Sequence, residues 1–433
     1  MQLNQIIGST SRTVATKSGE LEMPAEEVFL ARQPIFDRTK AVHAYELLFR
    51  ASLENRAEFA DGSRATSHVI DTGFFTMGLE RLTAGKPAFI NFPRDLLLRE
   101  WATLLPPKLA VIEILEEVVP EPEILKALAR LKEQGYVLAL DDFVCTDGYE
   151  PLIKLADVIK VDFLLTEPDV RRQLLDQLSQ LGHPGLSLLA EKVETYSEFE
   201  EALELGFRYF QGYFFSKPSV LSARRIPAHK MTYVRILQEI QNPALDFGKL
   251  EEVIKGDLSL TTKLLQYINA AAFPWRRRIE SVRQALVLLG ETPLRKWVSV
   301  VALSEMMSDK PRELAVTACV RGHLCEGLGA TMTPRPSELD CFLVGSFSTL
   351  SAMLDVDLEE GLKQLPLSRD VADALRGKDN EFGRMLKAVL AYEQAQWAEA
   401  AALTKSLGIA EDVLPNLYVD AVKWADRIFE TSL

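Results

Sequence analysis

Short apolar runs recur between Val28 and about Pro218, and most of them are continuous rather than alternating. Helix-like stretches separate several of the runs; one is "PEILKALARLKEQG", with a proline near its start and Gly135 at its end. Continuous apolar strands separated by helices are typical of parallel strands covered on both faces. The pattern predicts a (β/α)8 barrel, with the strands in "VFLARQPI", "AYELLF", "AFINF", "LAVIEIL", "VLALDDF", "VIKVDF", "LSLLAEKV" and "YFQGYFF".

The pattern changes after Pro218. The segment "SVLSARRIPAHK" is basic and interrupted by Pro227, as expected of a linker, and helical periodicity dominates from Met231 onward. We therefore predict an α/β barrel followed by an all-α domain. The predicted division is a loose tail over 1–26, a barrel over 27–218, a linker over 219–229 and a helical domain over 230–433.

Composition narrows the class of protein. The chain has 433 residues, of which 47% are hydrophobic and 26% charged, as in ordinary globular proteins. A net charge of −13 argues against broad binding to nucleic acids or anionic membranes. Four cysteines without CxxC spacing suggest reduced thiols, and no apolar stretch reaches the length of a membrane span or signal-peptide core, so we expect a cytoplasmic protein.

Asp141 and Asp142 raise a chemical question because they follow a buried strand directly. Burying two adjacent carboxylates is costly unless a cation compensates for their charge. Other polar residues occupy the same place, in or after a predicted strand, and the C-terminal strand ends of such barrels meet at one mouth. Hard divalent cations suit such oxygen-rich clusters, so the pattern favours Mg²⁺ or Mn²⁺ over scattered surface ion pairs. The other residues of the set are Glu46, Asn91, Glu113, Lys160, Asp162, Glu191 and Gln211.

The same residues resemble the motifs of the EAL domain of cyclic di-GMP phosphodiesterases, over Val28 to Pro218. Glu46 and Arg50 in "YELLFR" match the signature glutamate and the arginine that contacts substrate. The remaining matches are Asn91 in "AFIN", Glu113 in "IEILE", Asp141 and Asp142 in "DDF", Lys160 and Asp162 in "IKVD", Glu191 and Glu194 in "AEKVET", and Gln211 in "FQGYFF".

This resemblance implies a metal-dependent enzyme that hydrolyses cyclic di-GMP to linear pGpG. It implies substrate contact by Arg50 and catalytic roles for Lys160, Glu191 and Gln211, with Lys160 orienting the attacking water or stabilising developing charge. A homodimer is also expected from the resemblance. The implied metal ligands are Glu46, Asn91, Glu113, Asp141, Asp142 and Asp162.

The second half resembles the HDOD domain, most clearly from Ile226 to Met306, through "VIKGDLSLTTKLLQYINAAAF" and "SVRQALVLLG". HDOD domains are similar to HD phosphohydrolases without the metal ligands. This half has only His229 and His323 and no His-Asp pair, so the resemblance implies a regulatory module that binds an unknown protein partner.

The chain also departs from the EAL pattern. Val144, Cys145 and Thr146 follow "DDF" where active members usually have Gly-Thr-Gly, and Lys192 replaces a glycine beside Glu191. The alternative hypothesis is therefore a catalytically degenerate EAL-HDOD scaffold that acts by protein-protein contact.

Overall fold

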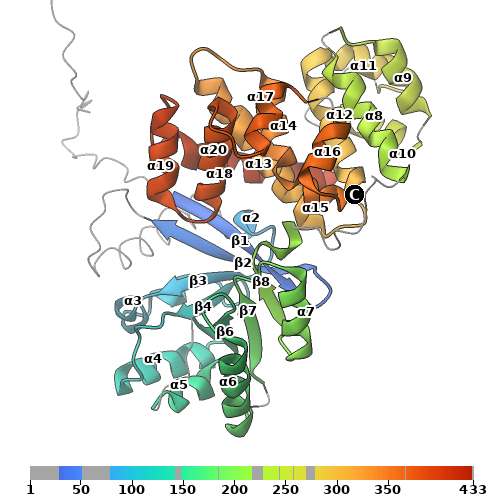
Figure 1. Ribbon diagram of the computed structural model, residues 1–433. Helices are drawn as coiled ribbons and strands as arrows, with labels where there is room; N and C mark the ends of the chain where they lie inside the picture. The colour runs from blue at the N-terminus through green and yellow to red at the C-terminus, as the bar shows by residue number, and fades with distance from the viewer. Residues whose placement is uncertain are drawn as a thin grey trace, which may run out of the picture.

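The computed structural model describes residues 29–50, 79–141, 148–183, 185–216, 228–242, 244–256, 258–269, 278–365 and 367–431. Within these residues the chain forms a closed eight-stranded barrel followed by a helical half, as the sequence predicts. Figure 1 shows the two halves in contact, with β1 and β2 reaching from the barrel toward the C-terminal helices. The predicted domain boundaries remain predictions.

The barrel strands follow one another in chain order around the closed sheet. All neighbouring strands from β2 to β8 are parallel. The strands are β1 (Phe29–Asp37), β2 (Val42–Arg50), β3 (Ala88–Phe92), β4 (Ala110–Ile114), β5 (Val137–Leu140), β6 (Val158–Asp162), β7 (Ser187–Glu191) and β8 (Tyr209–Gln211).

Strand β1 is the exception, because it runs antiparallel to both of its neighbours, β2 and β8. The reason is the connection of four residues between Asp37 and Val42, in which Asp37 Oδ1 accepts the N–H groups of Thr39 and Ala41. A turn this short can join only antiparallel strands, since a parallel pair needs a crossover of a dozen or more residues. The expectation of an all-parallel barrel was therefore wrong for this strand.

Helices pack around the outside of the barrel. Three of them begin with Pro122, Glu150-Pro151 and Pro168, where the missing N–H of proline costs no intrahelical hydrogen bond. The helical segments of this half are α2 (Leu79–Leu82), α3 (Arg94–Leu98), η2 (Trp101–Leu104), α4 (Pro122–Glu133), α5 (Glu150–Leu155), α6 (Pro168–Gln180), α7 (Tyr196–Glu204) and η3 (Tyr213–Ser216).

The second half is all helical in its described part. Side chains of Asp246, Ser281, Ser337 and Asn380 accept backbone N–H groups at helix N-termini, which fixes where those helices begin. The helices are α8 (Ala228–Gln241), α9 (Phe247–Lys255), α10 (Leu258–Ile268), α11 (Val282–Leu289), α12 (Glu291–Met306), α13 (Arg312–Thr331), α14 (Glu338–Ser346), η4 (Phe347–Thr349), α15 (Leu350–Leu354), α16 (Leu358–Gln364), α17 (Arg369–Leu375), α18 (Glu381–Glu393), α19 (Trp397–Ser406) and α20 (Val413–Thr431).

The two halves meet along the first part of β1. β8 pairs with β1 only from Ile35 to Asp37, so the backbone before Ile35 extends beyond β8. Two tyrosine hydroxyls, from α18 and α20, form hydrogen bonds with this part of the β1 backbone. The Tyr392 hydroxyl accepts from the N–H of Leu30 at 3.3 Å and donates to the Leu30 carbonyl at 3.1 Å. The Tyr418 hydroxyl accepts from the N–H of Arg32 at 3.2 Å. Covering unpaired strand backbone in this way satisfies groups that burial would otherwise leave costly.

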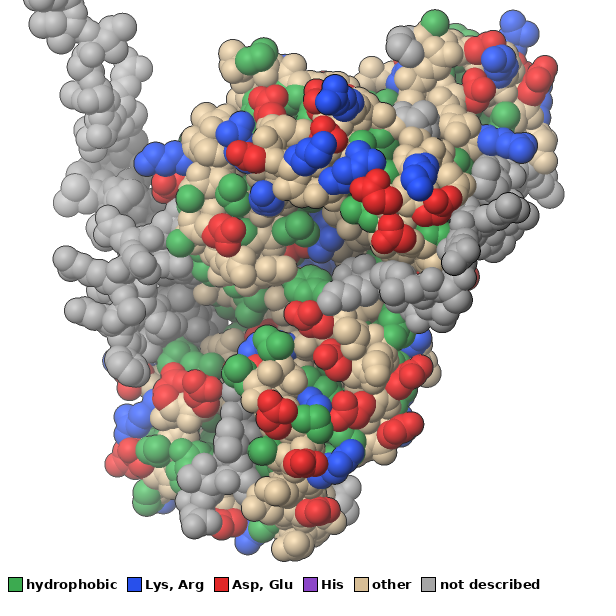
Figure 2. Space-filling model, viewed as in Figure 1, with side chains coloured by type: hydrophobic (Ala, Val, Ile, Leu, Met, Phe, Trp, Pro, Cys, Tyr) green, Lys and Arg blue, Asp and Glu red, His purple; other side chains and the backbone are tan. Residues whose placement is uncertain are grey.

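In the described part of the chain, no single helix is long and apolar enough to cross a membrane. A bent pair, Glu338–Leu354 with Leu358–Gln364, passes the same test of length and composition, with a turn of 113° between its arms. On the face shown in Figure 2, acidic and basic side chains are interspersed over both halves. Cys319, Cys325 and Cys341 are free thiols buried in the helical core.

Candidate active site

Two layers of side chains fill the barrel. The lower layer is apolar and takes one residue from every strand: Ile35, Ala44, Phe89, Val111, Ala139, Val158, Leu189 and Tyr209. Side chains two positions apart lie on the same face of a strand, so the next inward residue toward the C-terminal mouth forms a second layer. That layer is polar at all eight positions around the barrel, with Asp141 directly after the end of β5. It consists of Gln33, Glu46, Asn91, Glu113, Asp141, Lys160, Glu191 and Gln211.

Lys160 lies at the centre of the polar layer. Its side chain is almost fully buried, and its Nζ is 2.5 Å from Glu191 Oε1, 2.8 Å from Asp141 Oδ1 and 3.4 Å from Glu46 Oε2. It also forms an ion pair with Glu113. Lys160, Glu46, Glu113 and Glu191 are all buried. One ammonium group therefore faces four carboxyl groups, so that full ionisation would leave this cluster with an excess of negative charge.

The excess of carboxyl groups over ammonium groups shifts the pKa values of this cluster. Burial raises the pKa of Glu113 well above its usual value, although Lys160 opposes the shift, and the neighbouring carboxylates raise the pKa further. Burial likewise raises the pKa of Glu191 to about 8. Burial alone would lower the pKa of Lys160, but the surrounding carboxylates raise it well above its usual value. The cluster thus resists carrying its full negative charge unless further positive charge is present.

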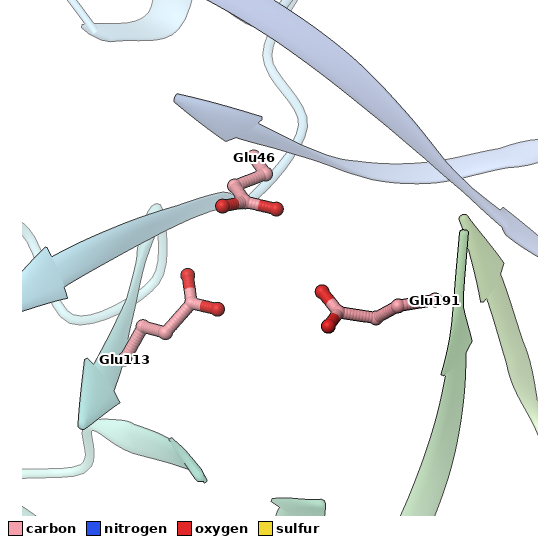
Figure 3. Close-up of side chains that lie close together, drawn as sticks. All are labelled: Glu46, Glu113 and Glu191. Carbon is pink, nitrogen blue, oxygen red and sulfur yellow. The ribbon is translucent and has the colours of Figure 1, made fainter. Parts of the chain in front are cut away.

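The carboxylates fit a divalent cation. Glu46, Glu113 and Glu191 each offer an oxygen, and these atoms lie within 4.8 Å of one another. Figure 3 shows the three side chains pointing toward a common centre from β2, β4 and β7. Glu113 Oε2 is buried and has no hydrogen-bond partner among the described residues. An orphaned carboxylate oxygen in a cluster of hard oxygen donors suits Mg²⁺ or Mn²⁺.

Gln211 closes the polar layer beside Glu46. Its Nε2 donates to Glu46 Oε2 at 2.7 Å and to Gln33 Oε1 at 3.0 Å. Its Oε1 is buried without a hydrogen-bond partner in the described part of the chain. Gln211 therefore holds one oxygen of Glu46 and leaves its own carbonyl oxygen for a water or a substrate group.

Asp162 belongs to a higher level than the Lys160 cluster. It lies two residues beyond Lys160 in β6 and is paired in register with Glu191 of β7. Its Oδ1 accepts the N–H groups of Leu164 at 2.7 Å and Leu165 at 2.9 Å, and its Oδ2 forms an ion pair with Lys192. The assignment of Asp162 as a metal ligand remains a prediction, and in this structure its carboxylate stabilises the loop after β6.

The structure brings together Glu46, Glu113, Asp141, Lys160, Glu191 and Gln211 of the residues predicted from sequence. Asn91 is in β3, in register with Glu113 of β4. Asp142 and the segment Val144 to Thr146 lie outside the described residues, as does the side chain of Arg50.

Gln33 was not predicted as a site residue. Its side chain accepts from Gln211, and in the register of β1 and β2 it lies opposite Glu46. The sequence carried a usable signal, because Gln33 is a polar residue two positions from the apolar Ile35 in a barrel strand. Its neighbours hid that signal: Arg32 and Pro34 make "ARQPI" resemble the end of an edge strand.

Comparison with protein families gives two matches. Residues 80–218 match the EAL domain and residues 226–345 match the HDOD domain. Among solved structures, the Bacillus subtilis YkuI protein, an EAL-domain protein in complex with cyclic di-GMP and calcium, is 19% identical. That match covers 54% of this chain and 73% of YkuI, with a TM-score of 0.35.

Two curated relatives match nearly the whole chain. The uncharacterised protein YuxH of Bacillus subtilis is 36% identical over 411 residues, which cover 93% of this chain and 99% of YuxH. The cyclic di-GMP phosphodiesterase CdgJ of Vibrio cholerae is 34% identical over 403 residues, which cover 92% of this chain and 93% of CdgJ. The chain belongs to the EAL-HDOD family, in which an EAL barrel precedes an HDOD domain.

Proposed function

We propose that this protein is a metal-dependent phosphodiesterase that hydrolyses cyclic di-GMP to linear pGpG. The observation that carries the proposal is the cluster of Glu46, Glu113, Asp141 and Glu191 around Lys160 at the mouth of the barrel. Similarity to the phosphodiesterase CdgJ over 92% of the chain supports the substrate. The HDOD domain would then serve as a regulatory or partner-binding module.

The residues proposed to hold the cations are Glu46, Asn91, Glu113, Asp141, Asp142 and Asp162. Carboxylate and amide oxygens are the ligands that Mg²⁺ and Mn²⁺ prefer. When bound, such a cation polarises a phosphodiester oxygen and lowers the pKa of a coordinated water. The same positive charge would allow the crowded carboxylates to ionise together.

The remaining residues are proposed to position the carboxylates and the substrate. Lys160 holds the carboxylates together, and its proximity of 2.5 Å to Glu191 allows a proton to move between Nζ and Oε1. Gln211 fixes Glu46 through Nε2, which leaves Oε1 free of protein donors in the described part of the chain. Arg50 is proposed to contact the substrate.

The test is an assay of the purified full chain with cyclic di-GMP and Mn²⁺, with separation of the guanine nucleotides. We expect linear pGpG in the presence of Mn²⁺, and its loss on chelation of the metal or in Glu46→Ala. Glu100→Ala, which breaks a surface ion pair with Arg130 outside the site, is the matched control and should retain activity. Absence of hydrolysis at any divalent concentration would refute the proposal.

A second candidate is a non-catalytic scaffold, and the ion pair between Lys192 and Asp162 favours it. This pair places a fixed positive charge beside Glu191 and occupies one oxygen of a predicted ligand. A protein that binds Mn²⁺ or cyclic di-GMP but forms no pGpG would be assigned to this class.

A further inference from the structure

Gln33 connects the polar layer of the barrel to the helical half. Its Oε1 accepts from Gln211 Nε2 at 3.0 Å, and its Nε2 donates to the backbone carbonyl of Glu393 at 3.4 Å. Glu393 is the last residue of α18, where carbonyl groups lack partners within the helix. A side chain from β1 therefore bonds at one end to the candidate active site and at the other to the end of a helix from the second half.

The end of α18 is held in place from two sides. The buried Glu393 carboxylate accepts from Arg321 of α13, at 2.8 Å from Nε and 2.7 Å from the nearer Nη. On the adjacent position of α18, Tyr392 bonds to both backbone groups of Leu30 in β1. The Glu393 carbonyl is therefore a fixed acceptor rather than one end of a mobile chain.

These hydrogen bonds allow each glutamine side-chain amide only one of its two orientations. An amide has a donor side and an acceptor side, and a buried amide is stable only when each faces its complement. The Glu393 carbonyl selects the orientation of Gln33 that places Nε2 toward α18 and Oε1 toward Gln211. That oxygen in turn selects the orientation of Gln211 that directs Nε2 to Glu46. With Gln211 reversed, its carbonyl oxygen would face the Glu46 carboxylate and repel it.

We propose that Gln33 is a positioning residue through which the C-terminal end of α18 fixes the amide of Gln211 and the carboxylate of Glu46. The expected effect on hydrolysis rests on the proposed function, whereas the effect on side-chain geometry and cation binding does not. The proposal gives the helical half a direct structural role at the active site.

The cavity beside Gln33 has no room for a bound nucleotide. A cavity of about 50 Å³ lies beside Gln33, bordered by Glu393, Arg321 and Tyr418. This volume holds water molecules but is far below the several hundred cubic ångströms of a small-molecule site. The contact around Gln33 is therefore interpreted as support for the active site rather than as a second ligand site.

Gln33→Met tests the proposal because methionine matches the length of glutamine but neither donates nor accepts a strong hydrogen bond. Tyr418→Phe is the matched control: it removes one hydrogen bond to β1, from the N–H of Arg32, without touching Gln211. Three measurements on the full-length protein apply to both variants: the Mn²⁺ dissociation constant by calorimetry, the kinetics of cyclic di-GMP hydrolysis, and a crystal structure.

We expect Gln33→Met to raise the Mn²⁺ dissociation constant and lower kcat by about tenfold, the lower end of the effect of residues behind metal ligands. Tyr418→Phe should change both by less than about twofold, because the hydrogen bond that it removes, from the N–H of Arg32, involves neither Gln211 nor Glu46. The crystal structure of Gln33→Met should show the Gln211 amide turned away from Glu46. If Gln33→Met does not fold, Gln33→Asn replaces it, since its amide is too short to reach both partners.

The outcomes separate this proposal from the proposed function. A Gln33→Met structure with Gln211 still bonded to Glu46 overturns the positioning role, as does wild-type Mn²⁺ affinity in that variant. A wild-type protein that neither binds Mn²⁺ nor forms pGpG overturns the proposed function, and the crystal structures alone then decide whether Gln33 orients Gln211.

Discussion

Lys192 forms an ion pair with Asp162 from a left-handed backbone conformation, with φ of 53°. A side chain in this region costs on the order of 1 kcal/mol relative to glycine, and glycine is what the EAL motif usually has at this position. The lysine therefore keeps the backbone path of a glycine and adds a positive charge beside Glu191. We expect this charge to compete with a cation for Asp162.

Replacing Lys192 should strengthen cation binding. Both Lys192→Gly and Lys192→Met remove the competing charge, and we expect each to lower the Mn²⁺ dissociation constant by about two- to fivefold, the range for a half-exposed ion pair. Lys192→Arg keeps the charge and serves as the control. Calorimetric titration of the four proteins measures the effect. Equal affinities in wild type and Lys192→Met would show that the lysine does not oppose the cation.

A cation should also stabilise the fold. We expect Mn²⁺ to bind the folded cluster and not the unfolded chain, so it should stabilise the protein by about 2.7 kcal/mol at a hundred times its dissociation constant. Asp141→Asn removes a carboxylate that contacts Lys160 and should abolish most of this gain. Asp169→Asn, at an exposed position on α6, should leave the gain intact. Thermal unfolding with and without Mn²⁺ provides the measurement, and a curve unchanged by millimolar Mn²⁺ would exclude the metal site.

Much of the candidate site could be predicted from the sequence because barrel geometry repeats. Each strand places its inward residues at a spacing of two, so a polar residue after an apolar run falls at the mouth. This rule located Glu46, Glu113 and Glu191 without any knowledge of their contacts. The level of Asp162 could also have been counted, because it lies two residues above Lys160 in the same strand.

The contacts between the halves could not be predicted in the same way. Gln33 and Glu393 are 360 residues apart, and even within the helical half Arg321 and Glu393 are 72 apart, so no local pattern connects them. Their proximity depends on how α13 and α18 pack together against β1. A charged residue in a helix predicts only that it needs water or a partner, and the partner is set by tertiary packing.

Glu313 should make the stability of the protein depend on pH. It is buried where α13 meets the barrel and accepts from Tyr45 at 3.1 Å, close to Arg32, Asp426 and Arg312. Burial raises its pKa from 4.5 to about 7, although Arg32, Tyr45 and Arg312 oppose the shift. The folded state therefore holds a proton that the unfolded state has lost between pH 4.5 and 7.

The sign of the effect follows from this difference. The contribution of Glu313 to the free energy of unfolding is fully present below pH 4.5. It is lost as the pH rises through about 7, which lowers the free energy of unfolding by up to about 3 kcal/mol. Glu313→Gln keeps an acceptor for Tyr45 and should make the protein more stable than wild type at pH 8. Glu399→Gln, at an exposed position on α19, is the control. Urea unfolding at pH 5 to 8 measures both, and equal pH profiles for wild type and Glu313→Gln would contradict the prediction.

Lys160 provides the most direct test of how the cluster is neutralised. Its ammonium group contacts Glu46, Glu113, Asp141 and Glu191, and it is almost fully buried. Removing one partner of a buried ion pair typically costs about 3 to 5 kcal/mol, because the remaining charge is left without compensation. Lys160→Met should therefore unfold at a lower temperature than wild type in the absence of divalent cations and should lose hydrolysis.

Mn²⁺ should restore part of the stability that Lys160→Met loses. A divalent cation supplies the positive charge that the lysine no longer provides, so the increase in melting temperature on adding Mn²⁺ should be larger in Lys160→Met than in wild type. Lys132→Met is the matched control, since it breaks a partly exposed ion pair with Asp157. Its small loss of stability should not respond to Mn²⁺ beyond the wild-type effect. If Mn²⁺ raises the melting temperature of Lys160→Met no more than that of Lys132→Met, the charge of the four carboxylates is neutralised by protonation rather than by a cation. The hypothesis that this cluster is a metal site would then be wrong.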